Sequence, residues 1–586
     1  MENKVFEDIV HLLQGADWLY NYPMTQVFTR NIFTHMPVEW QKALTDLPLD
    51  VLNGLPQCLT QDQWPSSLKV FLQECQRLSC LSPDLGPQTS GGSRRGSSSS
   101  NVSGSSSSSS SSSNLQIPQE LTYGLTVKKK HEITTLLSIV KEMLDLTGSK
   151  HILDIGSGKG YIDSCIHRIL HAQVLGVEGN CKLMRSAEKH HWKLYGRCRG
   201  ITFLNWYLSD NTETLCRAEQ LVSYLTELDT TCSCQTSPKR GTSSAKVASK
   251  TVSSSNIDGR ESKSSNHECS DSPDSFTDSE SSMGNGSVCS ENRCVLLGLH
   301  ACADLSPIII KVFRDCVQAS SLVLLSCCYH KMSLRPKAAD DPASDKQESQ
   351  CKGSDDTEGH GECPVEGDPP QNEEMIPGES DFMNFPMSQS LQEIFRQNNF
   401  HMSVFGLRLG AQKSGQNWCT ETLEDHEYHT RNVAYRGILE AACVEEGLTL
   451  RKLRRRCVRK SGFEDFSEYK RNIFDNYEFQ KTGSDGTPME SVPNSESTLN
   501  MNEDKILERN THISATLDTC FENHKHYFPL IEPLTGLQLA LQPVIEILVQ
   551  MDRLIYLKEC GFSRVWLEKV FDAEVSPRNI ALLAVR

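Results

Sequence analysis

The chain has 586 residues, a formal net charge of −16 and 23 cysteines. A length of this size would allow roughly three or four domains if every residue folded. Three polar segments, 229–291, 337–380 and 481–510, together account for the whole negative charge. The remaining chain is therefore close to neutral, and a nucleic-acid partner is not excluded.

The cysteines and the apolar segments indicate the cellular compartment of the protein. The cysteines are scattered along a long chain, which is typical of reduced thiols in an intracellular protein of the cytoplasm or nucleus. The first residues, MENKVFEDIVHLLQG, lack the apolar core of a signal peptide. The most apolar later segment, 537–557, contains Glu546, Asp552 and Arg553, so it predicts a core helix and no membrane contact.

Folded and polar segments alternate along the chain. Low-complexity serine-rich and acidic stretches cannot bury enough apolar surface to offset their ordering entropy, so we expect them to be disordered. In chain order we expect an α-helical N-terminal cap (1–83), a serine-rich linker (84–119), the first part of an α/β domain (120–228), a disordered insertion (229–291), the second part of the α/β domain (292–334), an acidic disordered insertion (335–380), a helical and basic insertion (381–480), a disordered segment (481–510) and a closing helix and strands (511–586).

Within the α/β domain, short β-branched runs alternate with helical patterns. We expect helices at 134–146, 160–171, 181–193, 305–317 and 534–560, and strands at 151–155, 173–177, 201–204, 294–299, 321–326, 563–571 and 579–586. This alternation predicts a doubly wound, mostly parallel sheet with helices on both faces.

The segment HILDIGSGKGYI (151–162) places three alternate glycines directly after a strand. A dinucleotide-binding G-x-G-x-x-G loop would need a glycine where Tyr161 stands, and a phosphate-binding G-x-x-x-x-G-K-[ST] loop fails at both ends. The pattern D-x-G-x-G-x-G fits Asp154, Gly156, Gly158 and Gly160. This pattern predicts a loop for S-adenosyl-L-methionine, which has no pyrophosphate and needs backbone room for an amino acid and a ribose.

Two further acids follow the next strands. Glu178 ends the second strand, where an acid accepts hydrogen bonds from ribose hydroxyls in related nucleotide folds. Asp210 follows the third strand and is a candidate partner of the adenine amino group. The alternative is that Asp210 is an ordinary surface aspartate without a ligand, which is equally common at such a position.

Several segments resemble the methyltransferase-like protein 25 family. They are VKKKHEI (127–133), ILDIGSGKG (152–160), LLGLHACADLS (296–306), LSCCYHKM (325–332), MDRLIYLKECGF (551–562) and SPRNIALLAVR (576–586). The resemblance covers the helical cap, the split α/β domain and the C-terminal segment. It implies a class I, seven-stranded methyltransferase fold and an active methyltransferase that uses S-adenosylmethionine. It also suggests that the basic run Lys128–Lys130, followed by His131 and Glu132, borders the cofactor mouth, where the bare sequence predicts only a solvated helix start.

The ends of the fourth and fifth strands supply the candidate catalytic residues. His300 is a credible general base, Asp304 could orient it, and His330 lies with Tyr329 at the neighbouring edge. The alternative is that these histidines only cap buried strand ends. The two segments are also distantly similar to a tRNA 2′-O-methyltransferase family, from which they depart at Ala303 and Tyr329.

The same region is rich in cysteines. Cys302, Cys327 and Cys328 accompany the two histidines and suggest zinc, but successive strand side chains point to opposite faces. We therefore expect reduced core cysteines and no metal.

The methyl acceptor is the least determined feature. The basic run RKLRRRCVRK (451–460) on a near-neutral chain favours RNA over protein as the acceptor, unless it is only a solvated basic face or a nuclear-import signal. The alternative to an enzyme is a cofactor-binding scaffold without turnover. The sequence predicts neither the acceptor atom nor the oligomeric state.

Overall fold

The computed structural model describes residues 2–80, 115–196, 198–227, 293–335, 380–412, 415–453, 460–481 and 503–586. The expectations for the serine-rich tract, for the insertions at 229–291 and 336–379, for 482–502 and for the arginines at 454–456 lie outside these residues.

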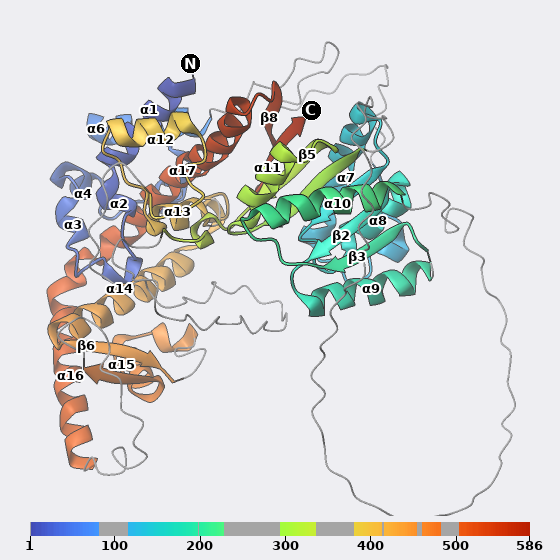
Figure 1. Ribbon diagram of the computed structural model, residues 1–586. Helices are drawn as coiled ribbons and strands as arrows, with labels where there is room; N and C mark the ends of the chain where they lie inside the picture. Colours follow the sequence, from blue (N-terminus) through green and yellow to red (C-terminus); the bar gives the residue numbers. More distant parts are fainter. Residues whose placement is uncertain are drawn as a thin grey trace, which may run out of the picture.

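Seven strands form one sheet in the order β3-β2-β1-β4-β5-β9-β8 (Figure 1). Their bounds are β1 (His151–Ile155), β2 (Gln173–Glu178), β3 (Ile201–Asn205), β4 (Cys294–Ala301), β5 (Ala319–Ser326), β8 (Arg564–Lys569) and β9 (Ile580–Val585). Strands β1 to β5 are parallel, whereas β9 is antiparallel to both β5 and β8. This arrangement confirms the predicted mostly parallel sheet of a class I methyltransferase fold. Because strand order reverses between β1 and β4, the carboxyl ends of these two strands are the expected ligand edge.

Alternate residues of each strand face two different hydrophobic clusters. In β1, Leu153 and Ile155 pack with one cluster, and Ile152 packs with the other. The first face is covered by α10 (Thr212–Glu227), α11 (Leu305–Asp315) and α17 (Ile531–Glu559), and the second by α7 (Val127–Thr147), α8 (Tyr161–Leu170) and α9 (Cys181–Tyr195). Burial of both faces explains why the strands are continuously apolar.

The remaining helices form a body on one side of the sheet, at the left of Figure 1. Its helices are α1 (Glu2–Gly15), α2 (Asp17–Tyr20), α3 (Ile32–His35), α4 (Val38–Leu44), α5 (Leu49–Gly54), α6 (Ser66–Ser79), α12 (Gln389–Gln397), α13 (Val404–Gly410), α14 (Leu423–Glu445), α15 (Phe466–Asn476) and α16 (Glu503–His524). Several of them, including α6, α13 and α14, contact the 29-residue helix α17, which also contacts β8 and β9. One hydrophobic cluster therefore runs from the N-terminal helices through α17 to the sheet.

Three elements differ from the expectations. Helix α16 already begins at Glu503, within a segment expected to be disordered up to residue 510. Strands β6 (Leu448–Lys452) and β7 (Tyr477–Lys481) pair antiparallel inside the insertion that was expected to be helical. Helix α7 begins at Val127, capped by the Thr126 side chain, so the lysine run lies in its first turn.

The apolar C-terminal segment is part of the core. Residues Glu508–Glu559 are long and apolar enough to cross a membrane, but 89% of their most apolar window is buried inside the protein. Charged residues within it have internal partners: the Asp552 carboxylate accepts hydrogen bonds from the backbone N–H groups of Met387 and Ser388. The segment therefore has the features of a core helix.

Candidate active site

The glycine loop follows β1 at the ligand edge of the sheet. Gly156, Gly158 and Gly160 all have positive φ values, which L side chains rarely adopt. A Cβ atom on Gly160 would lie 2.6 Å from the Phe203 ring, so this glycine is required by packing. A Cβ atom on Gly158 would meet nothing within 4 Å. The backbone at Gly158 is therefore open for the close approach of a ligand.

Glu178, at the end of β2, lies directly beside this loop. Its carboxylate accepts hydrogen bonds from the Gly158 N–H at 2.9 Å and from the Asn180 N–H at 2.8 Å. The structure thus brings together the acid and the glycine that the sequence assigned to the cofactor.

Asp154, the acid of the loop pattern, points into the protein interior. It is 1% exposed, and Asp163 of α8 is fully buried beside it. Burial raises the pKa of Asp154 to about 7, and burial together with the neighbouring carboxyl raises that of Asp163. Two carboxyls cannot both ionise in such a site, so they share a proton near neutral pH. Asp154 is therefore buried beside Asp163, a neighbour that had no signal in the sequence.

Asp210 lies in the loop after β3 and already has a cationic partner. Its carboxylate accepts a hydrogen bond from Nζ of Lys311 at 2.6 Å. The same ammonium donates to the side-chain carbonyl of Asn384 at 2.8 Å. The structure thus links Asp210 to α11, and a role toward adenine stays a prediction.

His300 lies near the end of β4 and meets a residue from the start of α7. Its Nε2 atom is 3.2 Å from both carboxylate oxygens of Glu132, which is 2% exposed and also accepts a hydrogen bond from the Ser576 hydroxyl at 2.6 Å. Burial opposes ionisation of Glu132, but the hydrogen bonds from His300 and Ser576 and the charge of Lys128 outweigh it and lower its pKa. A carboxylate only accepts hydrogen bonds, so this contact requires a hydrogen on Nε2 and leaves Nδ1 outside it.

The structure does not join Asp304 to His300 as expected. The Asp304 carboxylate accepts hydrogen bonds from the backbone N–H and hydroxyl of Ser333, at 2.8 and 2.6 Å, and from the Asn384 amide at 3.0 Å. It therefore joins the start of α11 to two later loops. The carboxylate that contacts His300 is Glu132, whose only sequence signal was its place beside the lysine run.

The two residues expected at the neighbouring edge differ in their surroundings. Tyr329 is 1% exposed, its hydroxyl interacts with Glu546 and Gln550 of α17, and its ring lies under the Arg553 guanidinium. It is thus a core residue and does not line the site. His330 follows it in a short 3-10 turn, and its buried Nδ1 atom has no hydrogen-bond partner among the described residues.

Three cysteine side chains converge beside His300. The Sγ atoms of Cys302, Cys327 and Cys328 all lie within 4.8 Å of one another, and those of Cys327 and Cys328 are 3.6 Å apart. The argument that adjacent cysteines diverge is wrong here, because β5 ends at Ser326 and strand alternation does not extend to them. Hydrogen bonds from the other two thiols lower the pKa of Cys328, and contacts with the same two thiols raise that of Cys327.

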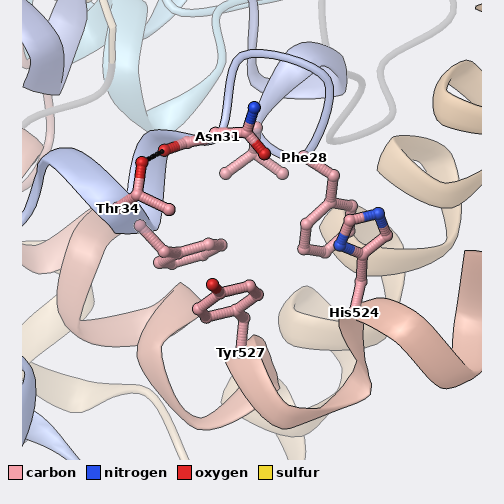
Figure 2. A pocket seen from close by; sticks show the side chains of 7 residues that line it. Phe28, Asn31, Thr34, His524 and Tyr527 are labelled. Carbon is pink, nitrogen blue, oxygen red and sulfur yellow. Dashed lines mark hydrogen bonds between the residues drawn. The ribbon is translucent and has the colours of Figure 1, made fainter.

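A small pocket elsewhere carries none of the predicted site residues. Figure 2 shows aromatic side chains around it, and Phe28 stacks on His524 while Tyr527 stacks on Phe33. It lies between the N-terminal helices and the 3-10 turn that follows α16. Its lining is mainly aromatic, and no residue of the glycine loop belongs to it.

Comparison with known proteins agrees with this geometry. Residues 128–335 match a family described as a methyltransferase domain, a range that includes Glu132, the glycine loop, Glu178 and His300. The chain is 21% identical over 527 residues to "Probable methyltransferase-like protein 25" of Mus musculus, covering 79% of this chain and 75% of that protein. It is 22% identical over 535 residues to the Homo sapiens protein of the same name, covering 80% and 76%. No solved structure matches.

The fold and the matched domain define the chain as a methyltransferase of class I, and such domains generally use S-adenosylmethionine. The chain is similar to methyltransferase-like protein 25 of two mammals over about four-fifths of its length. The resemblance seen in the sequence motifs is thereby confirmed.

Proposed function

We propose that this methyltransferase holds S-adenosylmethionine between the glycine loop and Glu178, and that it methylates RNA with His300 as the general base. The observation that carries the proposal is the buried Glu132 carboxylate 3.2 Å from Nε2 of His300, next to the ligand edge of the sheet. This pair fixes the histidine tautomer in which Nδ1 can accept a proton from the acceptor.

The residues at the loop fit the cofactor. The open space over Gly158 leaves room for backbone contact, and the Glu178 carboxylate is half-buried beside it, where ribose hydroxyls could donate to it. When bound, the cofactor supplies an activated methyl group on a sulfonium centre. The protein then has to position a nucleophile and, for a hydroxyl, remove its proton.

The surroundings of Glu132 support an anionic acceptor. Lys128, Lys129 and Lys130 are exposed in the first turn of α7, directly before Glu132. Exposed ammonium groups at this position could contact phosphates while the acceptor reaches His300. The near-neutral folded chain, the basic run at 451–460 and the distant likeness to a tRNA 2′-O-methyltransferase family also favour RNA. An intracellular location, in the cytoplasm or nucleus, belongs to the same proposal.

Transfer of a labelled methyl group tests the proposal. The purified full-length chain would be incubated with labelled S-adenosylmethionine and with separated RNA and protein fractions from cells that lack it. We expect label in RNA, its loss in His300→Ala, and wild-type labelling in the control His35→Ala, which removes an exposed histidine of α3. Neutralising Arg454, Arg455 and Arg456 should also flatten the salt dependence of RNA binding.

The other outcomes separate the alternatives. Label only in protein would overturn the RNA acceptor and keep the enzyme. Bound cofactor with no label in any fraction, and no effect of His300→Ala in cells, would favour a cofactor-binding scaffold.

A further inference from the structure

We infer that Cys302, Cys327 and Cys328 form a three-thiolate site for one Zn²⁺ ion at the carboxyl ends of β4 and β5. The inference is independent of the methyl acceptor, because its readout is bound metal. It replaces the expectation that these cysteines are only core residues.

The positions of the sulfur atoms fit a tetrahedral ion. With Zn–S bonds of about 2.3 Å, neighbouring sulfurs of a tetrahedral site lie about 3.8 Å apart. The three Sγ atoms lie within 4.8 Å of one another and the Cys327–Cys328 pair is 3.6 Å apart, so only small movements are needed. The 3.6 Å between the Sγ atoms of Cys327 and Cys328 is much longer than the S–S bond of a disulfide, which is about 2.05 Å. All three cysteines are free.

Core packing does not explain these three side chains. Cys294 and Cys316, from the same two βα units, are buried members of the hydrophobic core. Cys302, Cys327 and Cys328 are only partly buried and belong to neither hydrophobic cluster. Partial exposure leaves a path for an ion, and among the described residues this is the one group of histidine, cysteine and acidic side chains with metal-binding spacing.

The backbone around Cys302 is held in an unusual conformation. His300 and Ala303, on either side of it, have φ values of 58° and 53°, which non-glycine residues rarely adopt. The Ala303 N–H donates to the Cys328 carbonyl at 3.3 Å and joins the two cysteine segments. Such conformations persist where the surroundings enforce them, and they gather at functional sites. Here they turn Cys302 toward the other two thiols.

Three thiolates suit zinc and leave its fourth position open. Thiolate ligands select soft or borderline ions, and zinc sites with three protein ligands keep one position for water or substrate. The Cys327 thiol lies 3.7 Å from the His300 carbonyl oxygen, so the ion would lie beside the candidate base.

Metal content tests the site directly. The reduced full-length chain, stripped of metal and reloaded with Zn²⁺, would be desalted and its zinc per chain measured by mass spectrometry. We expect the triple variant Cys302→Ser/Cys327→Ser/Cys328→Ser to hold one zinc fewer than the wild type. The controls are the exposed Cys181→Ser and the double variant Cys232→Ser/Cys234→Ser, which removes a C-x-C pair outside the described residues. Both should leave this zinc in place.

A second measurement does not depend on the variants folding. Co²⁺ added to the stripped wild type should give the sulfur-to-cobalt charge-transfer absorption of a tetrahedral thiolate site, and one equivalent of Zn²⁺ should abolish it. Equal zinc in the wild type and the triple variant, or no thiolate band with Co²⁺, would overturn the inference. So would a native disulfide between any two of the three cysteines. Cofactor affinity measured on the same samples keeps this result separate from the proposed function, since neither Gly158 nor Glu178 contributes a ligand.

Discussion

Glu132 and His300 are 168 positions apart in sequence, yet Nε2 of His300 lies 3.2 Å from both oxygens of the Glu132 carboxylate. A third segment closes the contact, because the Ser576 hydroxyl donates to the same carboxylate. The start of α7, the end of β4 and the loop between β8 and β9 therefore meet at one buried anion. This meeting point is the geometry on which the proposed acceptor chemistry depends.

The first prediction concerns this pair. Glu132→Gln should lower kcat at least tenfold with little change in KM for the cofactor, because the amide no longer enforces the tautomer with a basic Nδ1. His300→Ala should lower kcat about 100-fold or more. Cofactor binding, measured by calorimetry, should stay within about twofold in both variants. Equal losses of cofactor affinity and kcat would instead assign the pair to the cofactor pocket or to folding.

The second prediction tests the cofactor pocket. Hydrogen bonds to a charged group contribute about 1.5–3 kcal/mol, so Glu178→Ala should weaken S-adenosylmethionine binding at least tenfold. The exposed Glu188→Ala on α9 is the matched control. Gly158→Asn is the sharper variant, because asparagine tolerates positive φ and the protein itself leaves room for the side chain. Gly158→Asn should keep the melting temperature of the wild type and bind S-adenosylmethionine more weakly. If calorimetry shows unchanged cofactor binding in both Glu178→Ala and Gly158→Asn, the assignment of the cofactor pocket is refuted.

A third prediction follows from the shared proton of Asp154 and Asp163. Their folded pKa values are raised above the ordinary value of 3.8. Stability from the protonated pair is thus fully present at low pH, and it is lost as pH rises toward about 7, the pKa of Asp154. Between pH 5 and about pH 7, the free energy of unfolding of Asp163→Asn should rise relative to that of the wild type by about 1 kcal/mol per pH unit. Denaturant unfolding between pH 5 and pH 8 measures it, with the exposed Asp62→Asn as control. Parallel curves for wild type and Asp163→Asn would contradict the shared proton.

The fourth prediction separates Asp304 from the chemistry. Asp304→Ala leaves the Ser333 N–H and the Asn384 amide without their acceptor, so the free energy of unfolding should fall by about 1–3 kcal/mol. At a temperature where the variant is folded, methyl transfer should fall less than tenfold, in contrast to His300→Ala. A loss of transfer as large as that of His300→Ala, at unchanged stability, would restore Asp304 as a positioning residue.

Local patterns in the sequence predicted the sheet and the place of the glycine loop at its edge. Strand β1 and the glycine loop are contiguous, and positive φ is a property of the glycines themselves, so their chemistry could be read from one short segment. The strands were predictable because burial on both faces selects uninterrupted apolar runs. Glu178 was predictable because parallel strands bring their carboxyl ends to one edge.

Only the tertiary structure decided which polar groups meet. The sequence suggested only Asp304 as a partner of His300, whereas packing places α7 beside β4, so that Glu132 contacts His300 and Asp304 binds Ser333. The cysteines after β5 converge because the chain leaves the strand there, where residue alternation no longer predicts direction. Tyr329 is buried against α17, and the residues of α17 that contact it lie more than 200 positions later in the chain. Secondary structure follows largely from local periodicity, whereas these contacts depend on how distant segments pack around a common core.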